Sequence, residues 1–268
     1  MIPVILLVAI AFIGMLLPHL PGRYDASAAT LSFVIQAASY SSLLMMPVGL
    51  AWIVTPRHAR LWNGLTWVVA GLVVMVIALS AVAVNHMAMG VILGIGVFIP
   101  LRLLRRQVQA EIERTEGVRH RLALYLTVVP LLLVTFVATV LPRASAWSRD
   151  RAIQHSADLI AEIEAFRQRR GHYPVSLQSL NRDVPTGVVG IERFHYEPTG
   201  ETYNVFFVRP AIALGAHEVV IFNPRDEQRF TSHELDVLQY DGAQLDLRRG
   251  DRRRTALVQP HWVSILFD

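Results

Sequence analysis

Long apolar stretches separated by short polar ones fill the first 142 residues of the chain. Residues 31–54 and 122–141 contain no Asp, Glu, Lys or Arg, and residues 61–101 form a longer uncharged run with an Asn-His pair near its middle. A helix needs about 20 apolar residues to cross the hydrocarbon core of a bilayer. Together with a shorter apolar run at 2–18, the pattern predicts five transmembrane helices, near 3–20, 32–54, 63–84, 88–104 and 122–142.

The first apolar run has an alternative interpretation as a signal peptide. Residues 26–28, Ala-Ser-Ala, resemble the small-residue site at which such peptides are cleaved. No positive charge precedes the run, however, and the segment between Pro18 and this triplet is long for a signal peptide. We therefore favour an uncleaved helix.

The pattern changes beyond residue 142, where hydrophobic positions follow a helical period among polar ones. Between Ser148 and Arg170, apolar or small residues recur every three or four positions, as on one face of an amphipathic helix. The stripe consists of Ala152, Ser156, Leu159, Ile163 and Phe166, widened by Ile153, Ala157 and Ile160. The sequence predicts a helix over 148–170 that buries this stripe.

A glycine and a proline end the predicted helix. Gly171 follows three arginines and suits the left-handed conformation at which many helices stop. The residue before a proline avoids the α region, so the pair Tyr173-Pro174 predicts extended chain. Residues 176–180, SLQSL, predict a short helical turn whose leucines cover the core. The segment as a whole predicts a packing corner between a helix and a sheet.

Alternation with a period of two follows and predicts an antiparallel sheet. Residues 203–209 and 217–222 are expected as strands, with a turn at 198–201 and a final strand at 261–268. Asp241-Gly242 is a pair preferred in two-residue turns, so it predicts a hairpin over 237–247. The resulting fold class is a multi-span α-helical membrane protein with a C-terminal α+β domain, in which a helix precedes an antiparallel sheet. The predicted domains are 1–142 and 143–268.

The distribution of arginines predicts how the helices are oriented. Cytoplasmic loops of membrane proteins carry an excess of basic residues. The loops after the second and fourth predicted helices fall on the same face and together carry eight arginines: Arg57, Arg60, Arg102, Arg105, Arg106, Arg114, Arg119 and Arg121. The loops on the opposite face carry one arginine, Arg23, before the last predicted helix. Three more arginines follow that helix on the same face and count against the assignment: Arg143, Arg149 and Arg151. We therefore predict a cytoplasmic N-terminus and an extracytoplasmic C-terminal domain.

Composition narrows the class of protein. All 25 basic residues are Arg, which indicates a GC-rich bacterial genome and hence a bacterial inner membrane. The absence of Cys excludes disulfides, thiolate nucleophiles and Cys-based metal sites. Four of the 21 acidic residues precede residue 143, so 17 follow it, where they nearly balance 16 arginines. A nearly neutral polar domain argues against binding to nucleic acid.

Apart from Arg102, which lies at the end of the fourth span and is counted with the following loop, the predicted spans lack Asp, Glu, Lys and Arg, the residues that mark ion and proton paths through membranes. This weighs against an ion-coupled transporter and against an intramembrane aspartyl or zinc protease. Four polar residues of the second span either line a polar interior or hydrogen-bond to neighbouring helices and their own backbone, which we favour: Gln36, Ser39, Ser41 and Ser42. Residues 103–121 are either a helix on anionic headgroups or a solvated connector, which we favour.

The order of elements and the corner motif resemble the pseudopilins and type IV pilin-like proteins. In that family a membrane helix runs into an amphipathic helix, followed by G-x-YP-x-S/T-L and an antiparallel sheet. The resemblance covers about residues 122–225, and the matching residues are Gly171, Tyr173, Pro174, Ser176, Leu177 and Leu180, followed by YEPTGETYNVFF. It implies a pilin-like fold for the outer domain. The N-terminus lacks the family's processing signature, a Gly before the cut and a Glu five residues after it, so polymerisation is not implied.

The sequence of the polar domain contains no recognised motif for catalysis or metal binding. The six histidines of the polar domain are not spaced as zinc ligands: His155, His172, His195, His217, His233 and His261. Residues 233–236, HELD, could contribute a histidine and two acids to a site, or they form a solvated loop, which we favour. The arginine run 248–254 either touches lipid phosphates or acidic envelope polymers or forms a solvated turn, and we favour the turn. We nominate no catalytic, cofactor-binding or metal-binding residue and no cofactor.

Two functions remain open. The first is an inner-membrane protein whose outer domain binds another envelope protein, as an assembly or sensory module, and this is the function we favour. The second is a membrane enzyme or permease subunit acting on a lipid or envelope substrate. The expected partners are the lipid bilayer and an envelope protein, and no nucleic acid.

Overall fold

A computed structural model describes residues 2–83, 116–180, 184–210, 217–228 and 252–267. The chain forms two compact units. The apolar unit contains residues 1–16 and 30–142, and the polar unit contains residues 143–268 together with residues 17–29. The sequence pattern had assigned all residues before 143 to the apolar part, and it gave no sign that 17–29 would fold with the polar one.

The apolar unit is built from five described helices: α1 (Ile2–Leu16), α2 (Ala26–Ser42), α3 (Met45–Val54), α4 (Ala59–Ala83) and α6 (Glu116–Thr139). Within the described residues, three helical runs are long and apolar enough to cross a membrane: Ala26–Val54, Pro56–Leu79 and the run that begins at His120. α1 is apolar but has only 15 residues. The predicted span 88–104 lies outside the described residues, so the structure shows three of the five predicted spans as long apolar helices.

The helical run from Ala26 to Val54 is interrupted by a turn at Leu43 and Leu44. Pro47 explains the interruption, because a proline has no N–H and its ring clashes with the carbonyl group four residues earlier. The serine hydroxyls before the turn donate to backbone carbonyls of their own helix, with Ser39 to Ile35 at 2.7 Å and Ser41 to Ala37 at 2.8 Å. The favoured interpretation of these serines as backbone-bonded is therefore confirmed.

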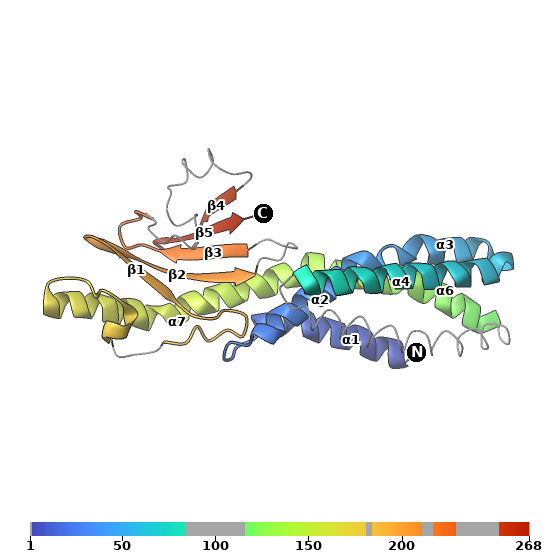
Figure 1. The fold of residues 1–268 in the computed structure, drawn as a ribbon, viewed down its shortest axis with the longest axis horizontal. Coiled ribbons are helices and arrows are strands. Elements are labelled where there is room, and N and C mark those ends of the chain that lie inside the picture. Colours follow the sequence, from blue (N-terminus) through green and yellow to red (C-terminus); the bar gives the residue numbers. More distant parts are fainter. Residues whose placement is uncertain (1, 84–115, 181–183, 211–216, 229–251, 268) are drawn as a thin grey trace. The chain divides into compact units, whose positions relative to one another are not determined.

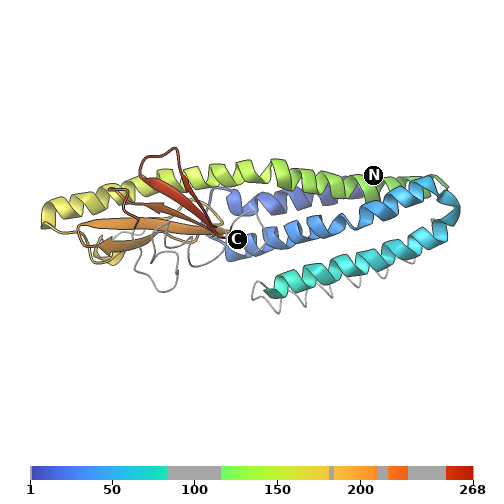
Figure 2. The same cartoon turned by 90° about the horizontal axis from the view of Figure 1, so that it is seen from above.

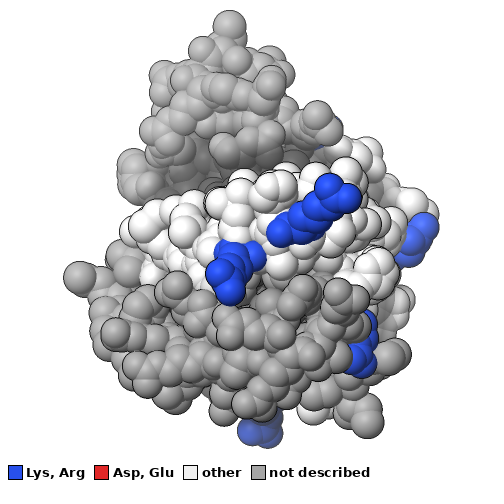
Figure 3. All heavy atoms as spheres, turned by 90° about the vertical axis from the view of Figure 1, so that its right-hand side faces the viewer, with Lys and Arg blue, Asp and Glu red and all other residues white. Residues whose placement is uncertain are grey.

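One end of the apolar unit gathers the N-terminal ends of α4 and α6. Trp52 of α3, Ala59 of α4 and Ala123 of α6 are buried together in one cluster. The exposed arginines Arg57 and Arg60 precede and begin α4, while Arg121 lies close to Ala123. Figure 3 looks onto this end and shows basic but no acidic side chains among the described residues.

The polar unit pairs one long helix with an antiparallel sheet (Figures 1 and 2). α7 (Leu141–Arg170) lies along one face of the sheet, and η3 (Leu177–Leu180) follows it. The strands are β1 (His195–Thr199), β2 (Thr202–Pro210), β3 (His217–Phe222), β4 (Arg252–Ala256) and β5 (Trp262–Phe267). They form a sheet of order β1-β2-β3-β5-β4 with every described neighbour antiparallel. The predicted C-terminal helix-then-sheet arrangement is confirmed, including η3 and the β1–β2 turn.

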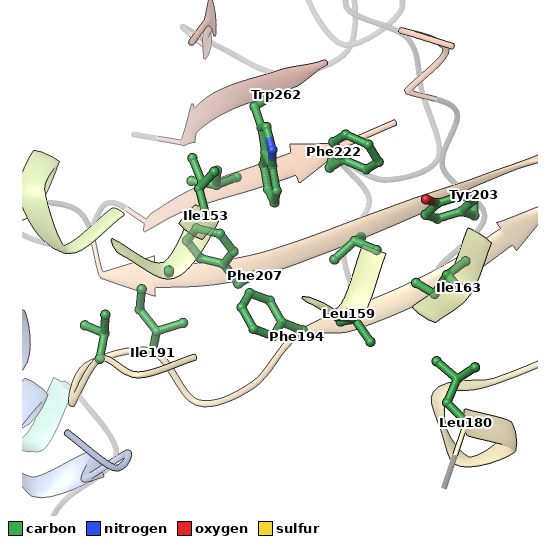
Figure 4. Close-up of a cluster of buried hydrophobic side chains, with 14 of the residues drawn as sticks. Ile153, Leu159, Ile163, Leu180, Ile191, Phe194, Tyr203, Phe207, Phe222 and Trp262 are labelled. Atoms are coloured by element: carbon green, nitrogen blue, oxygen red, sulfur yellow. The ribbon is translucent and has the colours of Figure 1, made fainter. Parts of the chain in front are cut away.

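The core of the polar unit lies between α7 and the sheet (Figure 4). α7 contributes Ala152, Leu159 and Ile163, which belong to the predicted stripe and are at most 2% exposed. The sheet contributes alternate residues of its strands: Tyr203, Val205 and Phe207 of β2, Val220 and Phe222 of β3, and Trp262 of β5. The period of two in the sequence therefore places these aromatic side chains against the helix.

The corner after α7 has the predicted architecture. Gly171 has φ = 79°, a left-handed conformation that a β-carbon disfavours, and its N–H donates to the Arg167 carbonyl at 2.8 Å. The Tyr173 ring is buried, with its centroid 4.8 Å from that of Tyr203. Arg167 Nη1 donates to the Tyr173 hydroxyl at 2.7 Å, and the guanidinium lies 4.5 Å from the ring centroid. The corner thus joins the end of the helix to the sheet core.

Several predicted features lie outside the described residues. They are most of the segment 103–121, the hairpin 237–247 with Asp241-Gly242, the HELD segment 233–236, and the first part of the arginine run, 248–251. The remaining arginines of that run, Arg252, Arg253 and Arg254, begin β4.

We predict that Tyr173→Ala lowers the free energy of unfolding of the polar unit by about 3 kcal/mol, because a large buried aromatic is lost. Tyr173→Phe is the matched control, since it keeps the ring and removes only the hydroxyl contacts, at about 1 kcal/mol. Thermal unfolding of the detergent-purified full chain, with hydrogen exchange of the β1–β3 amides, measures both. Equal stability of Tyr173→Ala and the parent chain would contradict this packing.

Candidate functional site

The loop between α1 and α2 is built into the polar unit by backbone hydrogen bonds. The N–H groups of Gly22 and Asp25 donate to the carbonyls of Gly187 and Val189, at 3.1 and 2.9 Å. In return, the N–H groups of Val189 and Gly190 donate to Leu20 and Pro18, at 3.0 and 2.7 Å. Pro21 and Val188 form an antiparallel bridge between the two segments. Residues 17–25, called the α1–α2 loop below, begin with a short 3-10 helix, η1 (Leu17–His19), and are joined to residues 187–190 by these hydrogen bonds and one isolated bridge.

A glycine permits this close approach. A β-carbon at Gly190 would lie 2.6 Å from the carbonyl oxygen of Pro18, a distance that real β-carbons essentially never show. Any side chain at this position would therefore push the α1–α2 loop away from the polar unit.

The face of the sheet that meets α7 changes from apolar to charged at one end. Along β2 the side chains of Tyr203, Val205 and Phe207 face α7, and Arg209 continues the same alternation. Glu218 lies directly opposite Arg209 in the register of β2 and β3. We call this end, where α7 begins, the base of the polar unit.

Arg209 and Glu218 are more than nine-tenths buried, and both hydrogen-bond to neighbouring elements, while the buried Nε of Arg209 has no partner. Arg209 Nη2 donates to Glu218 Oε2, and the hydroxyl of Ser264 on β5 donates to Glu218 Oε1. Arg209 Nη1 donates to the carbonyl and hydroxyl oxygens of Ser145 on α7, at 2.6 and 2.5 Å. Arg149 adds a second positive charge 3.9 Å from Glu218. The pair therefore links three strands to the first turn of α7.

His19 extends this network to the α1–α2 loop. Its Nδ1 lies 3.3 Å from the hydroxyl of Ser148, which in turn donates to the Ser145 carbonyl at 2.8 Å. Burial and the neighbouring Arg209 guanidinium lower the pKa of His19, which follows the end of α1, to about 4. The imidazole is therefore neutral near pH 7 and adds no charge beside Arg209. We call the set the basal clamp: His19, Ser145, Ser148, Arg209, Glu218 and Ser264.

A small cavity lies within the basal clamp. It is lined by Pro18, His19, Ser148, Gly190, Ile191 and Arg209. About 10 Å³ of it is open to a water molecule, which is room for about one water and far below the volume of a substrate or an organic cofactor. The geometry of the clamp suits attachment of the α1–α2 loop to the sheet rather than chemistry on a bound molecule.

The histidines considered in the sequence are dispersed over the polar unit. His155 lies beside Gly187, His172 is at the corner, and His195 stacks on Phe206. His217 begins β3, and His261 pairs with Asp226 at 3.1 Å on the surface. Among the described residues no three His, Asp or Glu side chains are grouped to hold a metal ion. His233 lies outside these residues.

Sequence reasoning missed the basal clamp. His19 and Ser148 are 129 positions apart, and Arg209 and Glu218 stand at strand ends where charged residues are usually solvated. The signal that was present is the alternation of β2 and β3, which puts Arg209 and Glu218 on the same face as Phe207 and Val220.

Comparison with known proteins finds no matching family model, no matching curated protein and no matching solved structure. The function is therefore argued from the chain itself.

We predict that Glu218→Gln lowers the free energy of unfolding by about 3–5 kcal/mol, because the Arg209 charge then stays buried without a counter-ion. The matched control is the double variant Arg209→Met with Glu218→Leu, which removes both charges at similar volume and should cost much less. Denaturant unfolding of the detergent-purified full chain gives both values. A double variant as unstable as the single one would show that the ion pair is not what the base depends on.

Proposed function

We propose that this chain is a multi-pass protein of the bacterial inner membrane that holds an extracytoplasmic α+β domain in place to bind another envelope protein. The observation that carries the proposal is that the α1–α2 loop and residues 143–268 fold as one unit. The polar unit is thus joined to the apolar helices by three chain connections, at 16–17, 29–30 and 142–143. A domain tied to the helices by three chain connections is more restricted in its motion than one on a single linker, which suits the presentation of one surface to a partner.

The same observation supports five membrane spans. Parts of one folded unit lie on the same side of a membrane, so the chain between residues 29 and 143 crosses it an even number of times. The described runs Ala26–Val54 and Pro56–Leu79 and the apolar helix α6 supply three crossings. The predicted span 88–104, which is uncharged as far as Leu101, supplies the fourth.

The packing of the apolar unit supports the same count independently. The N-terminal ends of α4 and α6 share the cluster of Trp52, Ala59 and Ala123. α4 leads away from that end, so the chain returns to it before α6 begins, which requires one more crossing between residues 84 and 115. With α1 as the first span, the total is five.

The arginines support an orientation with the N-terminus in the cytoplasm. Arg57, Arg60 and Arg121 are exposed at one end of the apolar unit, which is the end with the predicted excess of basic residues. Cytoplasmic loops carry such an excess. The polar unit then lies outside the cytoplasm, in the periplasm or at the cell surface.

We also propose that the polar unit has a pilin-like fold. The features that support this are a long helix, the Gly171–Pro174 corner and an antiparallel β1-β2-β3 meander in that order. The four additional predicted spans that precede α6 set the chain apart from proteins that assemble into a pilus. The role that fits is an anchored assembly or sensory module.

We predict that the end of the polar unit opposite its base contacts the partner. Val175 and Val258 are 80% and 99% exposed there, beside the corner and in the β4–β5 turn. A photo-crosslinking amino acid at either position in living cells should yield the same envelope protein. The same probe at Arg57, which we place in the cytoplasm, is the control and should not yield that product. Absence of any protein adduct at both valines would contradict a partner-binding role and favour the membrane-enzyme alternative.

A further inference from the structure

Large hydrophobic side chains are exposed at the base of the polar unit, where neither the core nor the basal clamp uses them. Leu20 and Tyr24 of the α1–α2 loop are 42% and 44% exposed, and Trp147 of α7 is 50% exposed. Arg23, also in the loop, is exposed as well. A single exposed hydrophobic residue is ordinary, but several large ones gathered at one place on a surface mark a site of interaction.

Hydrogen bonds show that the loop and α7 present these residues side by side. The carbonyl oxygen of Gly187 accepts from the N–H of Gly22 at 3.1 Å and from Arg151 Nε at 3.3 Å. The Arg151 guanidinium lies 5.7 Å from the ring centroid of Trp147. Arg151 therefore links Trp147 to the α1–α2 loop through the Gly187 carbonyl. We call the exposed and half-exposed side chains on the two sides of this link the basal rim: Leu20, Arg23, Tyr24, Trp147 and Arg151.

The chain leaves the polar unit for apolar helices on both sides of the basal rim. α1 ends at Leu16 and α2 begins at Ala26, so Leu20 and Tyr24 lie a few residues from each. α6 ends at Thr139, and Trp147 of α7 lies eight positions later in the sequence. Only a few residues of chain therefore separate the basal rim from the apolar helices that a bilayer would hold.

We propose that the basal rim lies among the phospholipid headgroups of the outer leaflet and is a lipid-binding surface. This inference rests on the membrane insertion proposed above. Trp and Tyr rings are favoured in the headgroup layer because one part of the ring is apolar and another is polar. Arg guanidinium groups donate two hydrogen bonds at once to phosphate oxygens.

The charge balance of the basal rim indicates which lipids it accepts. Asp25 lies two positions after Arg23 in the loop, and burial, together with the nearby carboxylates of Glu192 and Asp25, raises the pKa of the Tyr24 hydroxyl. Asp25 accepts hydrogen bonds from the N–H and hydroxyl of Ser27, at 2.9 and 2.5 Å. With acids beside the arginines, the surface recognises the phosphate group common to phospholipids and does not require an anionic headgroup.

The experiment uses single spin labels on the full chain, which has no native cysteine to compete. Tyr24→Cys and Trp147→Cys report on the basal rim, one at a time, so that the other aromatic anchor remains. Val258→Cys is the water reference, and Leu131→Cys, which is exposed on α6, is the hydrocarbon reference. Collisions with oxygen and with a water-soluble nickel complex are measured in phosphatidylcholine nanodiscs.

The expected result is headgroup depth for labels at 24 and 147, with several-fold fewer nickel collisions than at 258 and more than at 131. Labels at 24 and 147 that match 258, while 131 remains in hydrocarbon, would overturn the lipid-binding surface and leave the proposed membrane insertion intact. A label at 131 that reports water would contradict membrane insertion itself, and the basal rim with it. Labels at 24 and 147 shielded from both reagents would indicate a protein contact, such as a second copy of the chain, and would also overturn the proposal.

Discussion

Backbone hydrogen bonds between residues 18–25 and residues 187–190 are the constraint on which the rest of the molecule depends. They make the short loop between two apolar helices a part of the sheet domain that lies more than 100 residues further along the chain. The side of the membrane on which the loop lies is then also the side of the domain. In the proposed membrane arrangement, an even number of crossings between residues 29 and 143 follows from this contact, as do the three chain connections between the two units.

A buried ion pair lies beside this contact, at the base of the polar unit. Arg209 and Glu218 are costly to bury, and replacing such a pair by apolar residues often leaves stability unchanged. Here the pair determines how neighbouring elements are positioned, because the guanidinium and the carboxylate hydrogen-bond to each other and to residues of α7 and β5. These bonds join α7, β2, β3 and β5. His19 joins this network in its neutral form, so the loop is held by hydrogen bonds without a further charge beside Arg209.

The sequence predicted what local patterns determine and missed what distant residues determine. The α7 stripe and the alternation of β2 and β3 each depend on the period of one element, and the corner depends on the backbone restrictions of Gly171 and Pro174. The place of residues 17–29 depends on pairing with a segment near Gly190, and no local period encodes such a pairing. Buried charges such as Glu218 escape the same patterns, because a charged residue at the end of a strand looks like a surface residue.

The central claim, that the α1–α2 loop is part of an extracytoplasmic domain, is tested most directly by a disulfide. Pro21 and Val188 are bridge partners, and such partners have Cα atoms about 4.5–5.5 Å apart, within the range that a disulfide spans. In a chain without other cysteines, Pro21→Cys with Val188→Cys should form a disulfide in intact bacterial cells without added oxidant, whereas the control pair Pro21→Cys with Val175→Cys should stay reduced. A Pro21→Cys with Val188→Cys chain as reduced as the control, even after oxidant is added, would contradict the account.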